Sequence, residues 1–140
     1  MYPITYSHAF NYRLLAHVGP ARTFPAIEII LQRGDKKWSG LAIIDTGSMY
    51  SLFSYNVGTA LGLNVPAGQP QRLETLGGLM TAYRHKVELE IAHGWSLGDM
   101  EVLFAETNIS RNLLGRSDFL IRVQLGLDEQ RGMIYLGRSE

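Results

Sequence analysis

Leu41-Ala42-Ile43-Ile44-Asp45-Thr46-Gly47-Ser48 is the stretch of sequence from which the fold can be inferred. Its apolar run predicts a buried strand, and the Thr-Gly-Ser after Asp45 predicts the tight turn that ends it. Asp45 is therefore expected in a closed, poorly solvated place. Burying a carboxylate is costly unless it accepts hydrogen bonds or shares a proton, so Asp45 is the first candidate functional residue. The alternative is a buried turn aspartate with only a structural role.

The composition indicates one globular domain. The 140 residues are 46% hydrophobic and 19% charged, enough to bury a core. Thirteen basic residues balance thirteen acidic ones without a basic cluster, so no nucleic-acid partner is predicted. The absence of cysteine excludes disulfides and thiolate metal sites. We expect no metal and no other cofactor, because metal-ligand spacing is missing among His8, His17, His85 and His93.

The chain carries no recognisable targeting signal. Residues 1–6 lack the basic patch and apolar core of a signal peptide. No run approaches the roughly 20 apolar residues that a membrane span requires. We therefore expect a cytoplasmic protein without a membrane partner.

Short strands separated by Gly-containing turns predict an all-β closed sheet with one or two short helices. A hairpin around residues 33–36 leads directly into Asp45. A helix is expected over residues 54–63 with Ser54 as N-cap, and a helical turn after Ser117 or Asp118. The expected strands include residues 11–18, 26–31, 38–44, 81–91, 100–104, and 123–127 paired with 133–136.

Three motifs occur in order along the chain. Asp45-Thr46-Gly47-Ser48 follows an apolar strand, Gly77-Gly78 forms the expected tip of a hairpin, and Leu113-Leu114-Gly115-Arg116 precedes a short helical turn. A lone Asp-Thr-Gly recurs by chance, but the three motifs together are specific.

On these motifs, the chain resembles the retropepsin-like (retroviral-type) aspartic proteases, and most closely the non-viral bacterial and cellular members. The resemblance runs from about residue 25 to residue 136. It implies a retropepsin-like closed acid-protease barrel formed by a single domain, residues 25–140, with residues 1–24 as an N-terminal extension or first strand. It also implies that Leu114, Gly115 and Arg116 lie on the second strand of a ψ-shaped crossing.

Hydrolysis of an amide requires a base that activates water and an acid that protonates the leaving group. Two carboxylates roughly 3 Å apart share one proton and fill both roles, as they do in aspartic proteases. The chain has no second Asp-Thr-Gly, and its other aspartates stand in polar turns or beside arginine: Asp35, Asp99, Asp118 and Asp128. If Asp45 is catalytic, the enzyme is therefore expected to be a homodimer with the site on its two-fold axis.

The resemblance also assigns roles to the residues beside Asp45. Thr46 is expected to lock the two turns together across the dimer. Gly47 lets the backbone approach the substrate and offers its carbonyl as an acceptor. Ser48 is expected to donate a hydrogen bond to the outer oxygen of the Asp45 carboxylate, which would favour its charged form.

The Gly-rich hairpin is expected to be a flap over an extended peptide substrate. Glycines at the tip permit the positive φ angles of such turns and make the tip mobile, as a lid must be. Backbone pairing would give affinity, and side-chain pockets would give selectivity. The candidate flap and pocket residues are Leu76, Gly77, Gly78, Leu79, Met80 and Tyr50, although each apolar one could equally belong to the core.

The chain departs from the retroviral pattern after the Asp-Thr-Gly. Retroviral members carry acidic residues where this chain has Met49 and Tyr50, and those acids hold the substrate backbone and pair with the later arginine. Arg116 is therefore expected to reach Asp118 or the other subunit instead. Residues 122–136 resemble the extra C-terminal strands that build the dimer interface in non-viral relatives.

Two functions follow. The first is an aspartic endopeptidase that hydrolyses peptide bonds with a water activated by the two Asp45 carboxylates of a homodimer. The second is a catalytically silent dimer of the same fold that binds peptides or acts as a scaffold. Because Asp45, Thr46, Gly47 and Ser48 are all intact, the sequence favours the first.

Overall fold

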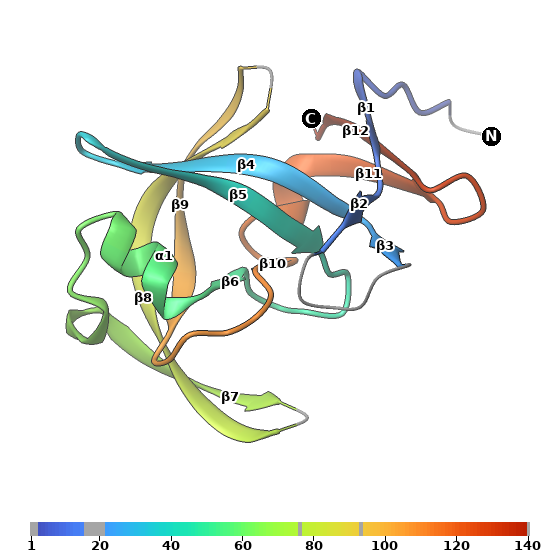
Figure 1. The fold of residues 1–140 in the computed structure, drawn as a ribbon. Coiled ribbons are helices and arrows are strands. Elements are labelled where there is room, and N and C mark those ends of the chain that lie inside the picture. Colours follow the sequence, from blue (N-terminus) through green and yellow to red (C-terminus); the bar gives the residue numbers. More distant parts are fainter. Residues whose placement is uncertain (1–2, 16–21, 76, 93, 140) are drawn as a thin grey trace.

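The computed structural model describes residues 3–15, 22–75, 77–92 and 94–139. The fold is all-β with short helical segments, as expected from the sequence (Figure 1). The strands are β1 His8–Asn11, β2 Arg13–Leu14, β3 Thr23–Phe24, β4 Ala26–Arg33, β5 Lys36–Ile44, β6 Leu52–Phe53, β7 Gln69–Thr75, β8 Gly78–Ile91, β9 Trp95–Ala105, β10 Leu113–Leu114, β11 Val123–Asp128 and β12 Met133–Arg138. The helical segments are α1 Tyr55–Ala60, η1 Val65–Ala67 and η2 Leu120–Arg122.

The main sheet closes on itself. Within the described residues, its strand order is β4-β5-β10-β6-β9-β8-β7, and β4 pairs in addition with β8. The β4–β5 hairpin turns at Gly34, whose φ of 60° suits a residue without a Cβ. The second strand of this hairpin, β5, ends beside β10 (Figure 1). Asp45 follows directly after the last residue of β5.

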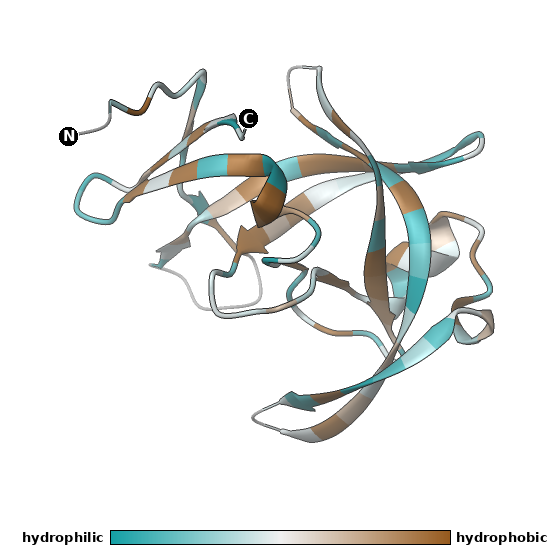
Figure 2. Cartoon of the chain, turned by 180° about the vertical axis from the view of Figure 1, so that it is seen from behind, coloured by the Kyte–Doolittle hydropathy of each residue, from teal (hydrophilic) through white to brown (hydrophobic). Residues whose placement is uncertain are grey.

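The long β8–β9 hairpin builds much of the core. Val87, Leu89 and Ile91 of β8 are buried, and Glu88 between them is exposed, as the alternating pattern predicted. Figure 2 shows the contrast between β9, which is mostly hydrophobic, and β7, which is mostly hydrophilic. The position of β7 therefore depends on its backbone pairing with β8 as well as on apolar burial.

A short β-strand crosses between two others close to Asp45. β10 runs parallel to β5, with Leu113 opposite Ile43 and Leu114 opposite Ile44, and Leu113 also pairs with Leu52 of β6. The predicted strand at Leu113–Arg116 is thus confirmed at its first two residues. This is the ψ-shaped crossing that the resemblance implied.

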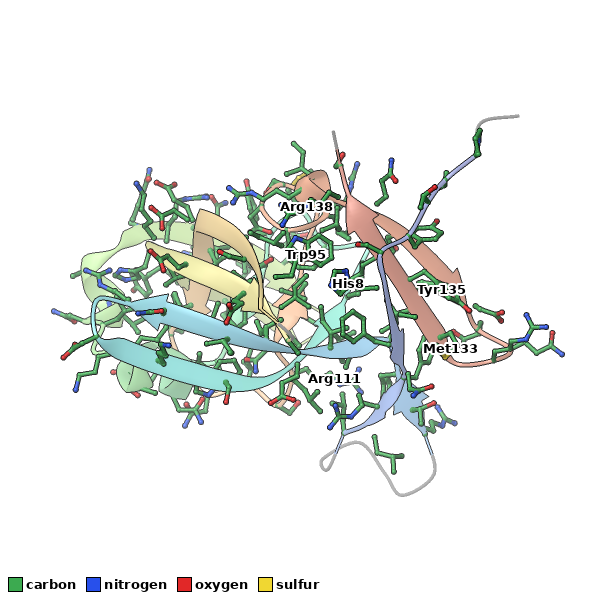
Figure 3. The ribbon with its side chains drawn as sticks, turned by 90° about the horizontal axis from the view of Figure 1, so that it is seen from above. His8, Trp95, Arg111, Met133, Tyr135 and Arg138 are labelled. Carbon is green, nitrogen blue, oxygen red and sulfur yellow. The ribbon has the colours of Figure 1, made fainter. Side chains whose placement is uncertain are left out.

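The two ends of the chain form a second sheet of order β1-β12-β11. The predicted pairing of residues 123–127 with 133–136 is confirmed, with Leu125 opposite Leu136 and Leu127 opposite Ile134. Figure 3 shows His8 of β1 against Trp95 of β9, and their ring centroids lie 4.6 Å apart. The guanidinium carbon of Arg138 lies 5.4 Å from the centroid of the same indole (Figure 3).

The first strand was predicted at residues 11–18, and this is wrong where the structure describes it. β1 spans His8–Asn11 and β2 only Arg13–Leu14, while residues 16–18 lie outside the described residues. The reason is the buried Tyr12, whose backbone N–H donates to the Gly132 carbonyl at 2.8 Å and separates the two strands.

The helices are shorter than predicted. α1 covers Tyr55–Ala60, and Ser54 is its N-cap residue, as predicted. The Ser54 side chain makes no capping hydrogen bond, and its Oγ accepts one from the Ile109 N–H at 3.0 Å. η2 begins at Leu120, and its N-cap residue is Phe119. Neither Ser117 nor Asp118 therefore caps this helical turn. No helix in the described part of the chain is long and apolar enough to cross a membrane.

Candidate active site

Asp45 lies directly after β5, at the ψ-shaped crossing. Its backbone N–H donates to the Leu114 carbonyl at 2.9 Å, and its Oδ1 accepts a hydrogen bond from the Gly47 N–H at 2.9 Å. The carboxylate is only half-buried, so the expectation of a closed, poorly solvated place is wrong for one chain on its own. The last three residues of β5 before it are buried, but Thr46 and Gly47 after it are exposed, and this leaves one side of the turn open.

Gly47 lies close to the Asp45 carboxylate, to which its N–H donates. A Cβ at this position would lie 3.3 Å from Asp45 Oδ1, closer than ordinary van der Waals contact. A side chain there would press on the same oxygen that the Gly47 N–H binds. Glycine at position 47 therefore serves a contact within the turn, and its approach to a substrate stays a prediction.

Ser48 does not make the predicted contact with Asp45. Its Oγ donates to the Tyr50 carbonyl at 2.7 Å, and a hydroxyl has one proton to give. The expected donation to the outer carboxylate oxygen is therefore wrong in this structure. The hydroxyl instead stabilises the loop that continues from the Asp45 turn toward β6.

A groove of about 780 Å³ opens beside Asp45. One wall is the loop from Asp45 to Tyr50, and the facing wall is β7 of the Gly-rich hairpin. The lining residues are Asp45, Gly47, Ser48, Met49, Tyr50, Leu52, Gln71, Arg72, Leu73, Glu74, Thr75 and Leu113. The structure thus brings Asp45, Gly47, Ser48 and Tyr50 together, and it adds β7 residues that the sequence prediction had not included.

Tyr50 is held in place as a wall of this groove. The Arg84 guanidinium carbon lies 5.2 Å from the centroid of its ring, which is within the range of a cation–π contact. Arg84 comes from β8, so the loop and the base of the hairpin are joined through this pair.

The predicted hairpin around Gly77-Gly78 is confirmed. β7 pairs with β8 up to Thr75 opposite Gly78, and Gly78 has a φ of 117°. Leu79 is 63% exposed, whereas Met80 is half-buried against the small cluster around Leu103. Neither is among the residues that line the groove, and Leu76 lies outside the described residues.

The segment after β10 runs directly beneath the Asp45 loop. The Arg116 N–H donates to the Ser48 carbonyl at 2.9 Å, and the Ser117 N–H donates to the Met49 carbonyl at 2.8 Å. Gly115 is needed for this approach, since a Cβ there would overlap the carbonyl group of Tyr50. Leu114, fully buried, anchors the segment in the core.

Asp118 is not the polar-turn residue that the sequence suggested. It is 7% exposed, and both of its carboxylate oxygens accept hydrogen bonds from Ser51. Of the two partners predicted for Arg116, Asp118 is not observed, because Arg116 is exposed and takes part in no ion pair within the described ranges. Contact of Arg116 with the other subunit stays a prediction. The sequence offers no signal for this burial beyond the apolar residues that follow Asp118.

The other face of the Asp45 turn borders an apolar hollow of about 540 Å³. Its lining combines Thr46 and Met49 with the segment before and along η2. The full set is Thr46, Met49, Arg116, Ser117, Leu120, Ile121 and Leu125. Met49 is 51% exposed and Ile121 is 67% exposed, so large apolar side chains face solvent beside the candidate site.

Among the described residues, no three His, Cys, Asp or Glu side chains are placed to hold a metal ion together. The polar side chains that line the groove include the carboxylates of Asp45 and Glu74 and the guanidinium of Arg72.

The fold and the site define an aspartic protease architecture, and comparison with known proteins agrees. The model of a family described as aspartyl protease matches residues 34–118, more than half of the chain. The chain therefore belongs to the aspartyl protease family, as the resemblance of its motifs indicated. No curated protein matches the chain.

Two solved structures show the same retropepsin-like fold. A retropepsin-like aspartic protease from Rickettsia conorii aligns with a TM-score of 0.60 and 16% identity over 79% of this chain and 88% of that one. The EIAV protease, solved in complex with the inhibitor HBY-793, aligns with a TM-score of 0.51 and 18% identity over 67% of this chain and 83% of that one.

Proposed function

We propose that this protein is an aspartic endopeptidase whose active site forms when two copies bring their Asp45 carboxylates together. The observation that carries the proposal is the position of Asp45. It lies at the end of a core strand, at the wall of a large groove, with a glycine-tipped hairpin strand facing it.

The groove suits an extended peptide. It runs between the Asp45 loop and β7, whose backbone pairs with β8 on one side only. Leu52, Leu73 and Leu113 supply apolar surface, while Arg72 and Glu74 supply charges. A peptide bound there would place a scissile carbonyl near Asp45, as extended ligands lie along a strand edge.

The proposed reaction uses water and no cofactor. One carboxylate takes a proton from water as the water oxygen bonds to the peptide carbonyl carbon. The other carboxylic acid gives its proton to the departing nitrogen as the C–N bond breaks. In one chain, the acids that line the groove are Asp45 and Glu74, and Glu74 is on the exposed hairpin strand. We assign the second role to Asp45 of the second copy.

The surface beside Asp45 supports self-association. Thr46 is exposed, and Met49 and Ile121 form an apolar surface around the second hollow. An exposed patch of this kind next to a candidate site favours a protein partner. We propose that Thr46 contacts its counterpart there, and that Arg116, exposed on the same surface, faces the second copy.

We also propose that residues 25–140 form the protease domain and residues 1–24 an N-terminal extension or first strand. The pairing of β1 with β12 supports a structural role for that extension, because it adds an edge strand to the sheet of the C-terminal segment.

Cleavage of a peptide library, followed by mass spectrometry from about pH 4 to pH 7, tests the proposal. The unaltered protein should yield products, and Asp45→Asn should yield none. Asp35→Asn, at an exposed turn outside the groove, should yield the products of the unaltered protein. Equal cleavage by the Asp45→Asn variant would contradict the proposal. Peptide bound by both proteins but cut by neither would favour the alternative, a silent peptide-binding or scaffold dimer.

A further inference from the structure

A buried carboxylate without a positive partner lies beneath the candidate site. Asp118 is 7% exposed, and the one ion pair in the described part of the chain joins Arg131 to Asp128 instead. Asp118 Oδ2 accepts from the Ser51 N–H at 2.8 Å, and Oδ1 accepts from the Ser51 Oγ at 2.6 Å and the Phe119 N–H at 2.7 Å. Burying a carboxylate is costly, and these hydrogen bonds offset part of that cost at Asp118. Asp118 is therefore expected to have a specific structural or functional role.

Ser51 is the link between this carboxylate and the Asp45 loop. It is fully buried, and its Oγ donates to Asp118 while accepting from the Gly115 N–H at 2.9 Å. An ionised carboxylate only accepts hydrogen bonds, so it fixes the direction in which the Ser51 hydroxyl donates. That direction leaves the hydroxyl oxygen free to accept from Gly115.

The loop from Asp45 to Ser51 is bonded to the segment from Leu114 to Asp118 at both of its ends. At the first end, the Asp45 N–H donates to the Leu114 carbonyl at 2.9 Å. At the other end, Ser51 binds Asp118 through its backbone and its side chain. Nothing in these contacts uses the exposed face of the loop, which remains available for substrate and for a second copy.

We infer that Ser51 and Asp118 are positioning residues that set where Asp45 stands. The inference rests on the proposed function and adds two residues that never touch the substrate. Two carboxylates that must share a proton roughly 3 Å apart leave little tolerance for error. A misplacement of about 1 Å at a reacting group can cost on the order of 100-fold in rate.

The network requires a carboxylate at position 118. Each of the two Asp118 oxygens accepts from a backbone N–H, Oδ2 from Ser51 and Oδ1 from Phe119. An asparagine would have to place its NH₂ group against one of those N–H groups, donor against donor, whichever way the amide is turned. The Asp118→Asn change therefore breaks the network although it preserves shape.

The first test compares kinetics with stability. We expect Ser51→Ala and Asp118→Asn to lower kcat by about 10-fold to 100-fold with KM changed by no more than about 2-fold. The exposed Asp35→Asn serves as the charge-matched control and should keep the kcat of the unaltered protein. The core change Val87→Ala on β8 serves as the control for stability, because it lowers Tm away from the site.

Val87→Ala distinguishes a positioning role of Ser51 from a general loss of stability. If Val87→Ala loses as much kcat as Ser51→Ala at an equal loss of Tm, both effects are structural and the inference is overturned. The double variant Ser51→Ala/Asp118→Asn should lose about as much kcat as one of the single variants, because the two residues act as a unit. Fully additive losses would also overturn it.

A second measurement stands apart from catalysis. Amide hydrogen exchange should speed up in Ser51→Ala at the Gly115 N–H, which donates to the Ser51 Oγ, and at the Asp45 N–H, which donates to the adjacent Leu114 carbonyl. Exchange should stay unchanged at Leu31 in β4. Unchanged exchange at Asp45 overturns the positioning role. A protein that shows the exchange effect but cleaves no peptide would refute the proposed function instead.

Discussion

The Asp45 turn shows how neighbouring residues shape one carboxylate. The Gly47 N–H supplies a hydrogen bond to Oδ1, the Leu114 carbonyl accepts from the Asp45 N–H, and Ser48 turns its hydroxyl away to Tyr50. The sequence predicted that Asp45 follows an apolar strand and begins a tight turn formed with Thr46, Gly47 and Ser48. The degree of burial could not, because it depends on what covers the exposed side of the turn.

We predict that Gly47→Ala lowers kcat/KM while leaving Tm almost unchanged. The added Cβ would lie 3.3 Å from Asp45 Oδ1, so the carboxylate must shift, but the position is exposed and no core contact is lost. A loss of about 10-fold or more in kcat/KM is expected from a shift of a fraction of an ångström. Full activity in a peptide cleavage assay would show that the carboxylate tolerates this displacement.

We predict that Gly115→Ala damages both the fold and the site. Here the added Cβ would overlap the backbone carbonyl of Tyr50 and lie 2.9 Å from the Ser51 nitrogen, and backbone cannot move aside as a side chain can. The free energy of unfolding should fall by about 2 kcal/mol or more. Urea unfolding measures this, and an unchanged midpoint would contradict the close packing of the two segments.

Asp118 marks the limit of sequence-based prediction at this scale. It looked like one more aspartate in a polar turn, yet it is buried and binds Ser51, which is distant in sequence. Local pattern cannot reveal such a contact, because it arises only when β10 enters between β5 and β6.

At the scale of elements, strands with strict alternation were predicted well, and ends of elements were not. Val87, Leu89 and Ile91 point into the core as the period of two requires. The N-terminal strand was misplaced because Tyr12 binds Gly132. Ser54 occupies the predicted N-cap position, but its hydroxyl binds Ile109 instead of the helix. In both cases, a tertiary contact outweighed a local preference.

The hairpin of β7 and β8 offers a test of the flap. Gly78 has a φ of 117° with open space around its Cα, so Gly78→Ala introduces backbone strain without a steric clash. We predict a fall of about 5-fold in kcat/KM for a peptide substrate, with Tm nearly unchanged because the tip is remote from the core. Unaltered kcat/KM would argue that this hairpin does not act as a flap.

At the scale of the whole molecule, the proposed reaction requires a second copy of the chain. The closed sheet, the crossing and the Gly-rich hairpin were predictable from the sequence, and the described residues of one chain contain all three. The catalytic pairing was inferred from the lack of a second Asp-Thr-Gly, and a single chain presents its Asp45 half-buried at an open edge. The second copy was predicted from the need for two carboxylates in the reaction, whereas hydrophobic periodicity predicts only the strands.

We predict that Ile121→Arg prevents self-association. Ile121 is 67% exposed and lines the hollow beside Thr46, so a charge there would oppose burial against a second copy. Leu14→Arg, at a site 60% exposed and outside that hollow, is the control. Sedimentation should give a monomer for the first variant and a dimer for the second, with cleavage lost only in the first. A dimer that survives Ile121→Arg would place the interface elsewhere.

The most direct test mixes active and inactive chains. Unaltered protein and Asp45→Asn are combined in equal amounts, dissociated, reassembled at random and assayed at fixed total concentration. If both Asp45 carboxylates serve one site, only dimers of two unaltered chains cleave, and activity should be about one quarter of that of the unaltered protein. Activity of about one half would mean that each chain acts on its own, and would contradict the shared site.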